Sequence, residues 1–385
     1  PRLAALAEEL AALSPARAAE AVADERDARR RALLDALAQL CDAEPAMAGA
    51  VDEAVAAVDR DVERLDELLR RQHYRLAYWR TAGEELDYRR FFNIETLVGV
   101  RQEQPDVFDA THRLVLQLVA DGTVHGLRID HVDGLRDPRG YLDRLAGRSG
   151  GAYTVVEKIL EAGEPLPDAW PVAGTTGYDF AARVANLFVD THHEAEMTDT
   201  YASLTGEEAS FPTVALAAKR QVMDEELATE VARVTALLAA VTDRHRRHRD
   251  HTRRVLRETL RELVAHFPVY RTYVRPGRPS TEVEHAHVAA AVRAAGAART
   301  DLDPELLAFV GQLALGGHQG VREAEFVWRF QQLTAPVMAK GVEDTAFYRY
   351  HRLISLNEVG GDPATFGRPV ARFHEDSAAS SSARA

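Results

Sequence analysis

Gly126-Leu127-Arg128-Ile129-Asp130-His131-Val132-Asp133-Gly134 is the stretch of this chain that says most about its fold. Its apolar first half predicts a short strand over residues 124–130. A helix is predicted before that strand, because Pro105 begins a run with apolar residues at helical spacing that stops at the turn Asp121-Gly122. The strand therefore follows a helix after a short link.

The same alternation continues beyond Gly134. Asp137 and Pro138 suit the N-cap and first turn of a second helix, which the glycine-rich run 147–151 ends. Residues 153–157, Tyr-Thr-Val-Val-Glu, predict a second strand. Helix, strand, helix and strand with short links indicate parallel strands joined by crossover helices. The predicted fold class is therefore α/β.

Two charged residues share one face of the first strand. Side chains two positions apart on a strand point the same way, so Arg128 and Asp130 lie together, with Leu127 and Ile129 opposite. Asp130 stands at the carboxyl end of the strand, where parallel αβ barrels carry their chemistry. A neighbouring arginine favours the ionised carboxylate and would lower its pKa, which suits a nucleophile.

A second carboxylate follows one crossover later. Glu157 ends the second strand, 27 residues after Asp130. Two consecutive parallel strands thus present one carboxylate each at the same rim. Retaining glycosidases need such a pair, about 5–5.5 Å apart, as nucleophile and acid/base. Partial burial after the apolar strand would raise the pKa of Glu157 toward that of a usable acid.

Each of these signals is weak by itself. An aspartate at a strand end is more often a loop cap, and a Glu-Lys pair after Val-Val is usually a strand terminus. Asp130, His131 and Asp133 also form a candidate metal site, because both residue types are metal ligands. The order and spacing of the pair favour the catalytic interpretation over these alternatives, although the residue patterns alone leave the two nearly balanced.

Composition narrows the class of protein. The 385 residues are enough for a barrel domain of about 250 residues plus a second helical unit. The net charge of −13 makes a nucleic-acid ligand a poor candidate and is acceptable for a neutral sugar. Cys41 is the single cysteine, expected to be buried on a helix, so no intramolecular disulfide forms and a cytoplasmic location is predicted. The sequence shows no membrane span, no signal peptide and no starting Met.

The remaining segments are mostly helical. Residues 1–72 read as a helical segment, 73–184 as a catalytic barrel portion, and 185–335 as a helical insertion. Met223, Leu227, Val231, Val234 and Leu238 mark one apolar stripe of that insertion. Strand texture over 336–356 predicts a return to the barrel in 336–376, and the Ser/Ala-rich end 377–385 predicts a disordered tail.

Several other side chains are candidates for binding a sugar. Trp79 can stack on a sugar ring, and core packing is about as probable. His131 adjoins Asp130 and either contacts the substrate or caps the strand. The remaining candidates form two groups. The first group is otherwise explained as part of an ordinary Gly-Thr turn, and the second as a surface salt bridge. These residues are Tyr178 and Asp179, and Lys340, Glu343 and Asp344.

At these residues the chain resembles a known family. The strand end with Asp130, and Glu157 after it, resemble the nucleophile and acid/base segments of α-amylase-type enzymes of glycoside hydrolase family 13. Longer strings resemble the maltooligosyltrehalose synthases within that group, and the resemblance runs from about residue 1 to 375. These strings are residues 74–80, 126–135, 156–160, 172–180, 267–274 and 338–350.

The resemblance implies a partial (β/α)8 barrel of α-amylase type with large helical insertions. It also implies an intramolecular transglycosylation that converts the reducing-end α-1,4 bond of a maltodextrin into an α,α-1,1 bond. Asp130 would be the nucleophile, Glu157 the acid/base, and Arg128 would hold Asp130 in place. No cofactor or metal is expected, because two carboxylates and sugar binding suffice. A functional association with a trehalose-releasing hydrolase is also suggested.

Two features of the family are not found here. An early strand segment of Asn-His type is absent, and the third catalytic carboxylate is expected shortly after residue 375 in a His-Asp segment that the chain lacks. We therefore expect an internal fragment with early and late barrel strands missing, inactive or poorly folded alone. The rival interpretations are another α-amylase-type hydrolase or 4-α-glucanotransferase, and a non-catalytic glucan-binding fragment.

Overall fold

The structure, a computed structural model, describes residues 2–13, 20–72 and 74–382. It separates into two compact units, Pro1–Tyr78 and Trp79–Ala385, which are described one at a time. Within the described ranges, no helix combines the length and the apolar character that crossing a bilayer requires.

Most of the described residues of the first unit lie in helices, as predicted for residues 1–72. Leu33 and Leu40 of α2 are buried, whereas Cys41 is only half-buried, contrary to the prediction. The Asp61 side chain caps α4 by accepting a hydrogen bond from the amide of Arg64. The helices are α1 (Arg2–Ala11), α2 (Glu20–Ala43), α3 (Pro45–Asp59) and α4 (Val62–Arg70).

The second unit contains a three-stranded parallel sheet in the order β3-β4-β5. Helices α6 (Pro105–Ala120) and α7 (Pro138–Arg148) alternate with β3 (Gly126–Ile129) and β4 (Tyr153–Val156), so both predicted helices, both strands and their parallel pairing are confirmed. The Asp137 side chain caps α7 by accepting from Gly140 N. The third strand, β5 (Gly174–Thr175), was not predicted, because two residues carry no periodicity.

A small core holds the carboxyl ends of β3 and β4 in place. Leu127 and Val156 from the strands pack against Phe108 of α6 and against Leu142 and Leu145 of α7. All five side chains are at most 8% exposed. Burial of each large apolar side chain contributes about 1.5–3 kcal/mol to stability, so the sheet register is strongly fixed.

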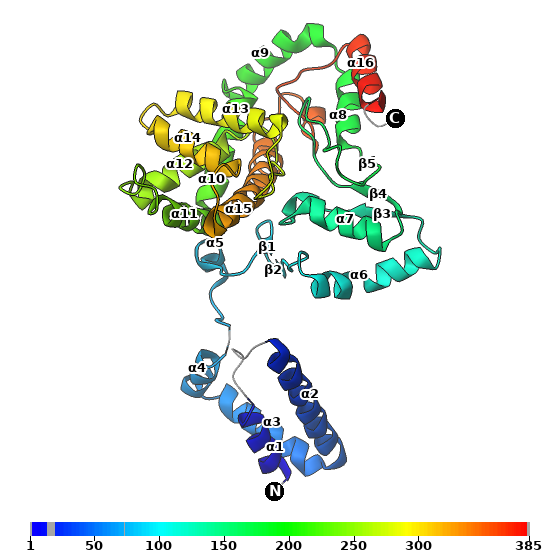
Figure 1. Ribbon diagram of the computed structural model, residues 1–385, viewed down its shortest axis with the longest axis vertical. Helices are drawn as coiled ribbons and strands as arrows, with labels where there is room; N and C mark the ends of the chain where they lie inside the picture. The colour runs from blue at the N-terminus through cyan, green and yellow to red at the C-terminus, as the bar shows by residue number, and fades with distance from the viewer. Residues whose placement is uncertain (1, 14–19, 73, 383–385) are drawn as a thin grey trace. The chain divides into compact units, whose positions relative to one another are not determined.

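The largest core of the described residues lies in a cluster of helices, α10 to α15, drawn from green to orange in Figure 1. The predicted stripe from Met223 to Leu238 is buried there. It belongs to two helices, because α10 ends at Asp224 and α11 begins at Ala228. The helices are α10 (Phe211–Asp224), α11 (Ala228–Thr242), α12 (Arg253–Ala265), α13 (Glu282–Ala298), α14 (Pro304–Ala314) and α15 (Val321–Met338).

The remaining helices and strands complete this unit. They are α5 (Ala82–Glu85), the antiparallel pair β1 (Arg90–Phe91) and β2 (Ile94–Val98), α8 (Tyr178–Leu187), α9 (Glu194–Thr205) and α16 (Val370–Ser382). Brief 3-10 turns cover η1 (Trp79–Thr81), η2 (Val132–Gly134), η3 (Thr191–His193), η5 (Ala346–Tyr348) and η6 (Ile354–Leu356).

The strand texture predicted over 336–356 is wrong. Helix α15 runs to Met338 and continues into a π-helical turn, η4 (Ala339–Glu343). The residues from Phe330 to Ala339 are all buried, so the C-terminal part of this helix is enclosed on every side. An enclosed helix shows no polar face, and its sequence then reads like a buried strand.

The disordered tail predicted over 377–385 is wrong for residues 377–382, which belong to α16. The helix contains Ala371, Ala378 and Ala379, and alanine favours helix formation. A hydrogen bond also connects α16 to α8, since the Arg183 side chain donates to the Asp376 carbonyl at 3.1 Å. Residues 383–385 lie outside the described residues.

Candidate active site

The two candidate catalytic carboxylates stand at neighbouring strand ends. Ile129 pairs with Val156 in the last register position of β3 and β4. The amide of Glu157 donates to the Ile129 carbonyl at 2.7 Å, which extends the ladder by one step. Asp130 and Glu157 therefore leave adjacent strands at the same edge of the sheet, as the sequence predicts.

Arg128 and Asp130 lie on one face of β3, as predicted. Arg128 donates from Nε at 3.1 Å and from a terminal nitrogen at 2.7 Å to the same oxygen, Oδ1 of Asp130. This hydrogen bond raises the pKa of Arg128. Both side chains are exposed, at 54% and 62%. The arginine thus fixes the rotamer of Asp130 and leaves its other oxygen facing outward.

Glu157 lies in a more enclosed environment than Asp130. Its Oε2 accepts a hydrogen bond from the backbone amide of His131 at 2.6 Å. Burial raises the pKa of Glu157, and the negative charges of Asp130 and Asp133 act in the same direction. The His131 amide and Arg128 oppose the shift without cancelling it. A partly enclosed carboxyl group with a raised pKa, next to a second carboxyl group, has the environment that a general acid needs.

His131 is positioned by aromatic rings rather than by a polar partner. Its backbone is left-handed, with φ 50°, and its ring packs on Phe91 at 4.8 Å and on Phe92 at 4.2 Å between centroids. Burial lowers its pKa to about 4, so the imidazole is neutral at physiological pH. Gly134 leaves room for the ring, since a Cβ there would lie 2.3 Å from His131 Nε2.

Lys340, Glu343 and Asp344 are brought toward this region by η4. The ammonium of Lys340 pairs with Asp344 at 2.5 Å and lies 5.1 Å from the ring centroid of Phe92, which itself contacts His131. Burial raises the pKa of Glu343 to about 7, and the charge of Glu157 contributes to that shift. Of these three residues, Glu343 is the one whose charge interacts with that of Glu157.

Sequence reasoning missed Tyr270, which links these groups. Its hydroxyl donates to Glu343, and its ring packs in a cluster with Ile159 and Met338, against which Phe92 and Tyr178 also pack. Tyr270 lies inside the 267–274 string quoted above, so the family resemblance was a signal that could have selected it.

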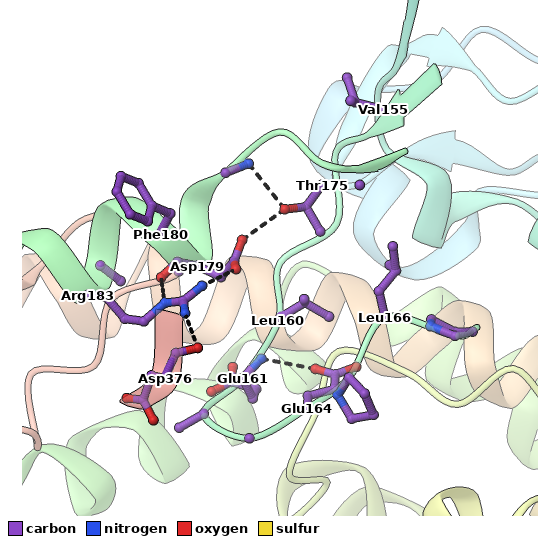
Figure 2. Close-up of a pocket in the computed structure, with 18 of the residues that line it drawn as sticks. Val155, Leu160, Glu161, Glu164, Leu166, Thr175, Asp179, Phe180, Arg183 and Asp376 are labelled. Carbon is purple, nitrogen blue, oxygen red and sulfur yellow. Dashed lines mark hydrogen bonds and ion pairs between the residues drawn. The ribbon is translucent and has the colours of Figure 1, made fainter. Parts of the chain in front are cut away.

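Tyr178 and Asp179, consecutive in sequence, take different environments. Tyr178 interacts with Arg128 and contributes to the raised pKa of that guanidinium. Asp179 instead accepts from the Thr175 hydroxyl and from Arg183, both at 2.8 Å. Figure 2 shows these bonds on the wall of a cavity of about 1130 Å³, whose lining includes Glu161. Asp179 is thus engaged with α8 rather than with Glu157.

Trp79 lies in η1 with its side chain 62% exposed. The guanidinium of Arg80 stands 5.2 Å from its ring centroid. Its role in stacking on a sugar stays a prediction.

The side chains of the alternative metal site point to different partners. Asp130 pairs with Arg128, His131 packs between phenylalanines, and Asp133 accepts from the hydroxyl of Tyr273 at 2.5 Å. Among the described residues, the structure holds no group of three or more His, Cys, Asp or Glu side chains arranged to bind a metal ion.

A second cavity, of about 1410 Å³, reaches Asp130 and His131. Arg89 contributes to its wall and donates to the Gly134 carbonyl at 3.1 Å. Burial lowers the pKa of Arg89 to about 10, with a further contribution from the charge of Arg329. The lining of this cavity includes both guanidinium and carboxylate groups, which suit a neutral ligand rich in hydroxyl groups.

Comparison with known proteins gives this geometry a context. No family model matches the sequence. A curated relative, found in two strains of Mycobacterium tuberculosis, is named as a maltooligosyl trehalose synthase. It is 38% identical to this chain over 309 residues. The match covers 80% of this chain and 37% of the relative.

Solved structures give the same result. The maltooligosyltrehalose synthase of Arthrobacter ramosus is 40% identical with a TM-score of 0.73, over 83% of this chain and 39% of that one. A hypothetical maltooligosyl trehalose synthase of Sulfolobus tokodaii is 30% identical with a TM-score of 0.63, over 81% of this chain and 37% of that one. The chain is therefore homologous to a segment of the maltooligosyltrehalose synthases, and it spans less than two fifths of the length of these relatives.

Proposed function

We propose that the full-length protein carrying this sequence is a maltooligosyltrehalose synthase. The observation that carries the proposal is the contrast between two neighbouring carboxyl groups. Asp130 is exposed and paired with Arg128, whereas Glu157 is more enclosed and has a raised pKa. One group suits a nucleophile and the other an acid that becomes a base. The homology to enzymes of this name supports the choice of reaction.

In the proposed first step, Glu157 protonates the oxygen of the α-1,4 bond to the reducing-end glucose. Asp130 attacks the anomeric carbon of the preceding glucose, the bond to the leaving oxygen breaks, and a covalent glycosyl-enzyme forms. Arg128 holds the attacking carboxylate throughout, since two of its nitrogens bind one oxygen of Asp130.

In the second step, the freed glucose turns within the site and presents its anomeric hydroxyl. Glu157, now ionised, removes the hydroxyl proton, and the oxygen displaces Asp130 from the anomeric carbon. Two inversions retain the α configuration and give an α,α-1,1 bond. Water must be excluded meanwhile, because it would release the chain by hydrolysis. Phe92, Tyr270 and the neutral ring of His131 supply apolar surface for this purpose.

We also propose that β3, β4 and β5 are part of a (β/α)8 barrel. Its other strands would correspond to parts of the relatives that this chain does not cover. The free edges of the three-stranded sheet support this, because an unpaired edge ordinarily requires a neighbour. The domain division at residues 73–184, 185–335 and 336–376 is part of the same proposal. So are the cytoplasmic location and an association with a trehalose-releasing hydrolase.

The test is the reaction of the full-length protein with maltohexaose, followed by reducing-end assay and mass spectrometry together. The proposal expects reducing ends to disappear while chain length stays constant, and Asp130→Asn to abolish the change. Shorter products with more reducing ends would mean a hydrolase. A broadened length distribution at constant reducing ends would mean a 4-α-glucanotransferase. Binding without turnover, unaltered by Asp130→Asn and Glu157→Gln, would mean a non-catalytic glucan-binding protein.

A further inference from the structure

We propose that Lys158 is a positioning residue, whose ammonium fastens the segment after β4 to the segment after β3 and so sets the place of Glu157 relative to Asp130. This inference rests on the proposed catalytic roles of the two carboxylates. Lys158 follows Glu157 directly. Because neighbouring side chains in extended chain point to opposite faces, it anchors the backbone beneath the acid.

The Lys158 ammonium is enclosed between two carboxylates. Its nitrogen lies 3.5 Å from Asp133 Oδ2 and 3.2 Å from Glu164 Oε1, and the three side chains are 0%, 8% and 5% exposed. Burial lowers the pKa of Lys158, but the attraction of Asp133 and Glu164 outweighs it, and the net shift is upward. The lysine therefore stays charged, and each partner oxygen is held close to it.

The two carboxylates come from the two segments that carry the candidate catalytic residues. Asp133 stands three residues after Asp130, in η2. Glu164 belongs to the loop after β4, where its Oε2 also accepts from the Glu161 amide at 3.0 Å, as Figure 2 shows. A movement of either segment would pull a buried charge away from Lys158, which is costly in a low-dielectric interior.

Further contacts hold the other side of this group. Asp133 accepts from the Tyr273 hydroxyl at 2.5 Å, and its carbonyl accepts from Arg271 at 2.6 Å. The Lys158 ammonium also lies 5.2 Å from the ring centroid of Tyr270, whose hydroxyl donates to Glu343. The ammonium thus contacts the segments after both strands and the 270–273 segment, and Tyr270 connects it to η4.

The charge of Lys158 also bears on the proton of Glu157. Besides burial, Asp130, Arg128, Asp133 and the amide of His131 act on the pKa of Glu157, and the charge of Glu343 interacts with it as well. Removing the lysine charge leaves Arg271 as the remaining cation beside Asp133, so the negative charge of Asp133 is less compensated and the pKa of Glu157 should rise. Removing the Asp133 charge should lower it. A purely structural role predicts neither shift.

The experiment measures kcat and KM for maltohexaose against pH in the full-length protein. For Lys158→Met we expect a fall in kcat of about 10–100-fold with KM little changed, and a basic limb displaced to higher pH. Lys158→Arg should recover part of kcat. Asp133→Asn should displace the basic limb to lower pH. Basic limbs that coincide with wild type in both charge variants would overturn the inference.

Two further variants separate positioning from folding. Lys219→Met removes another buried lysine, which donates to the Phe267 carbonyl at 3.2 Å, and should leave the pH profile in place. If Lys158→Met does not fold, the neutral triple variant Lys158→Met, Asp133→Asn, Glu164→Gln decides, because replacing a whole buried ion network is often tolerated. Wild-type kcat in the folded triple variant would overturn the inference. If the wild-type protein hydrolyses maltohexaose, the proposed function is contradicted but the inference about Lys158 is not. The same pH profiles would then be compared for the hydrolysis reaction.

Discussion

The backbone amide of His131 donates a 2.6 Å hydrogen bond to Oε2 of Glu157, so the residue after one candidate catalytic carboxylate holds the other. The left-handed backbone of His131 aims its amide at the glutamate. The same turn directs the His131 ring into the phenylalanine pair at 91 and 92. His131, which carries no charge at neutral pH, is therefore one of the residues that hold the two carboxylates in position.

Replacing either carboxylate should remove turnover while the fold persists. Glu157→Gln should lower kcat/KM on maltohexaose by about 10²–10⁴-fold, because the leaving oxygen no longer receives a proton. Asp130→Asn should prevent the covalent glycosyl-enzyme from forming, because it removes the carboxylate that attacks the anomeric carbon. Circular dichroism and thermal melting of the full-length variants serve as controls. Activity within tenfold of wild type in either variant would contradict the assigned roles.

Arg128 should matter for activity and not for stability. Its pair with Asp130 is solvent-exposed on both sides, and such pairs stabilise folded proteins little. Arg128→Met should therefore leave Tm unchanged but lower kcat by about 10–100-fold, because Asp130 loses the two nitrogen donors that fix its rotamer. Arg128→Lys should recover only part of kcat, since an ammonium lacks the planar fork. A Tm that falls in step with kcat would show a structural role instead.

Gly134→Ala should displace the His131 ring. The new methyl group would lie 2.3 Å from ring atoms Cδ2 and Nε2, and overpacking of this kind costs about 1–3 kcal/mol. Denaturant unfolding should show that loss, and kcat should fall with it. In a His131→Ala background the same substitution should cost much less. Equal costs in both backgrounds would mean that the ring is not what the glycine accommodates.

Gly341 lies where α10 meets η4, and a Cβ there would come within 2.8 Å of the Cα of Lys219. Because a backbone atom cannot move aside cheaply, Gly341→Ala should destabilise the protein by about 1–3 kcal/mol. Gly147→Ala in α7 is the matched control. No atom lies within 4 Å of its Cβ position, so a gain of about 0.5–1 kcal/mol is expected. Changes of the same sign in both variants would refute this packing argument.

Glu161 should make stability fall as pH rises. Burial raises its pKa from 4.5 to about 7. The folded protein then binds this proton more tightly than the unfolded chain, so the favourable contribution is complete below pH 4.5 and is lost as pH rises through about 7. Glu161→Gln should therefore raise Tm relative to wild type more at about pH 8 than at about pH 5. Glu208→Gln, on an exposed loop, is the control and should show no such trend. A pH-independent difference for Glu161→Gln would contradict the burial argument.

Some elements could be predicted from local sequence alone. Pro105, Asp137 and the β-branched run 153–156 mark helix starts and a strand, because proline geometry, capping and branched side chains act within a few residues. The face shared by Arg128 and Asp130 follows from the two-residue period of a strand. The sequence therefore determined the order of the elements around the carboxylate pair and the residues that end its two strands.

Only the tertiary structure decided what surrounds that pair. The end of α15 before η4 reads as a strand because every side of that part of the helix is buried. The contacts of Lys158 with Asp133 and Glu164, and of Tyr270 with Glu343, join segments up to 73 residues apart. No local pattern encodes these contacts, since burial, and with it the charge state of Glu157 and Glu343, depends on which distant segments exclude water from one place.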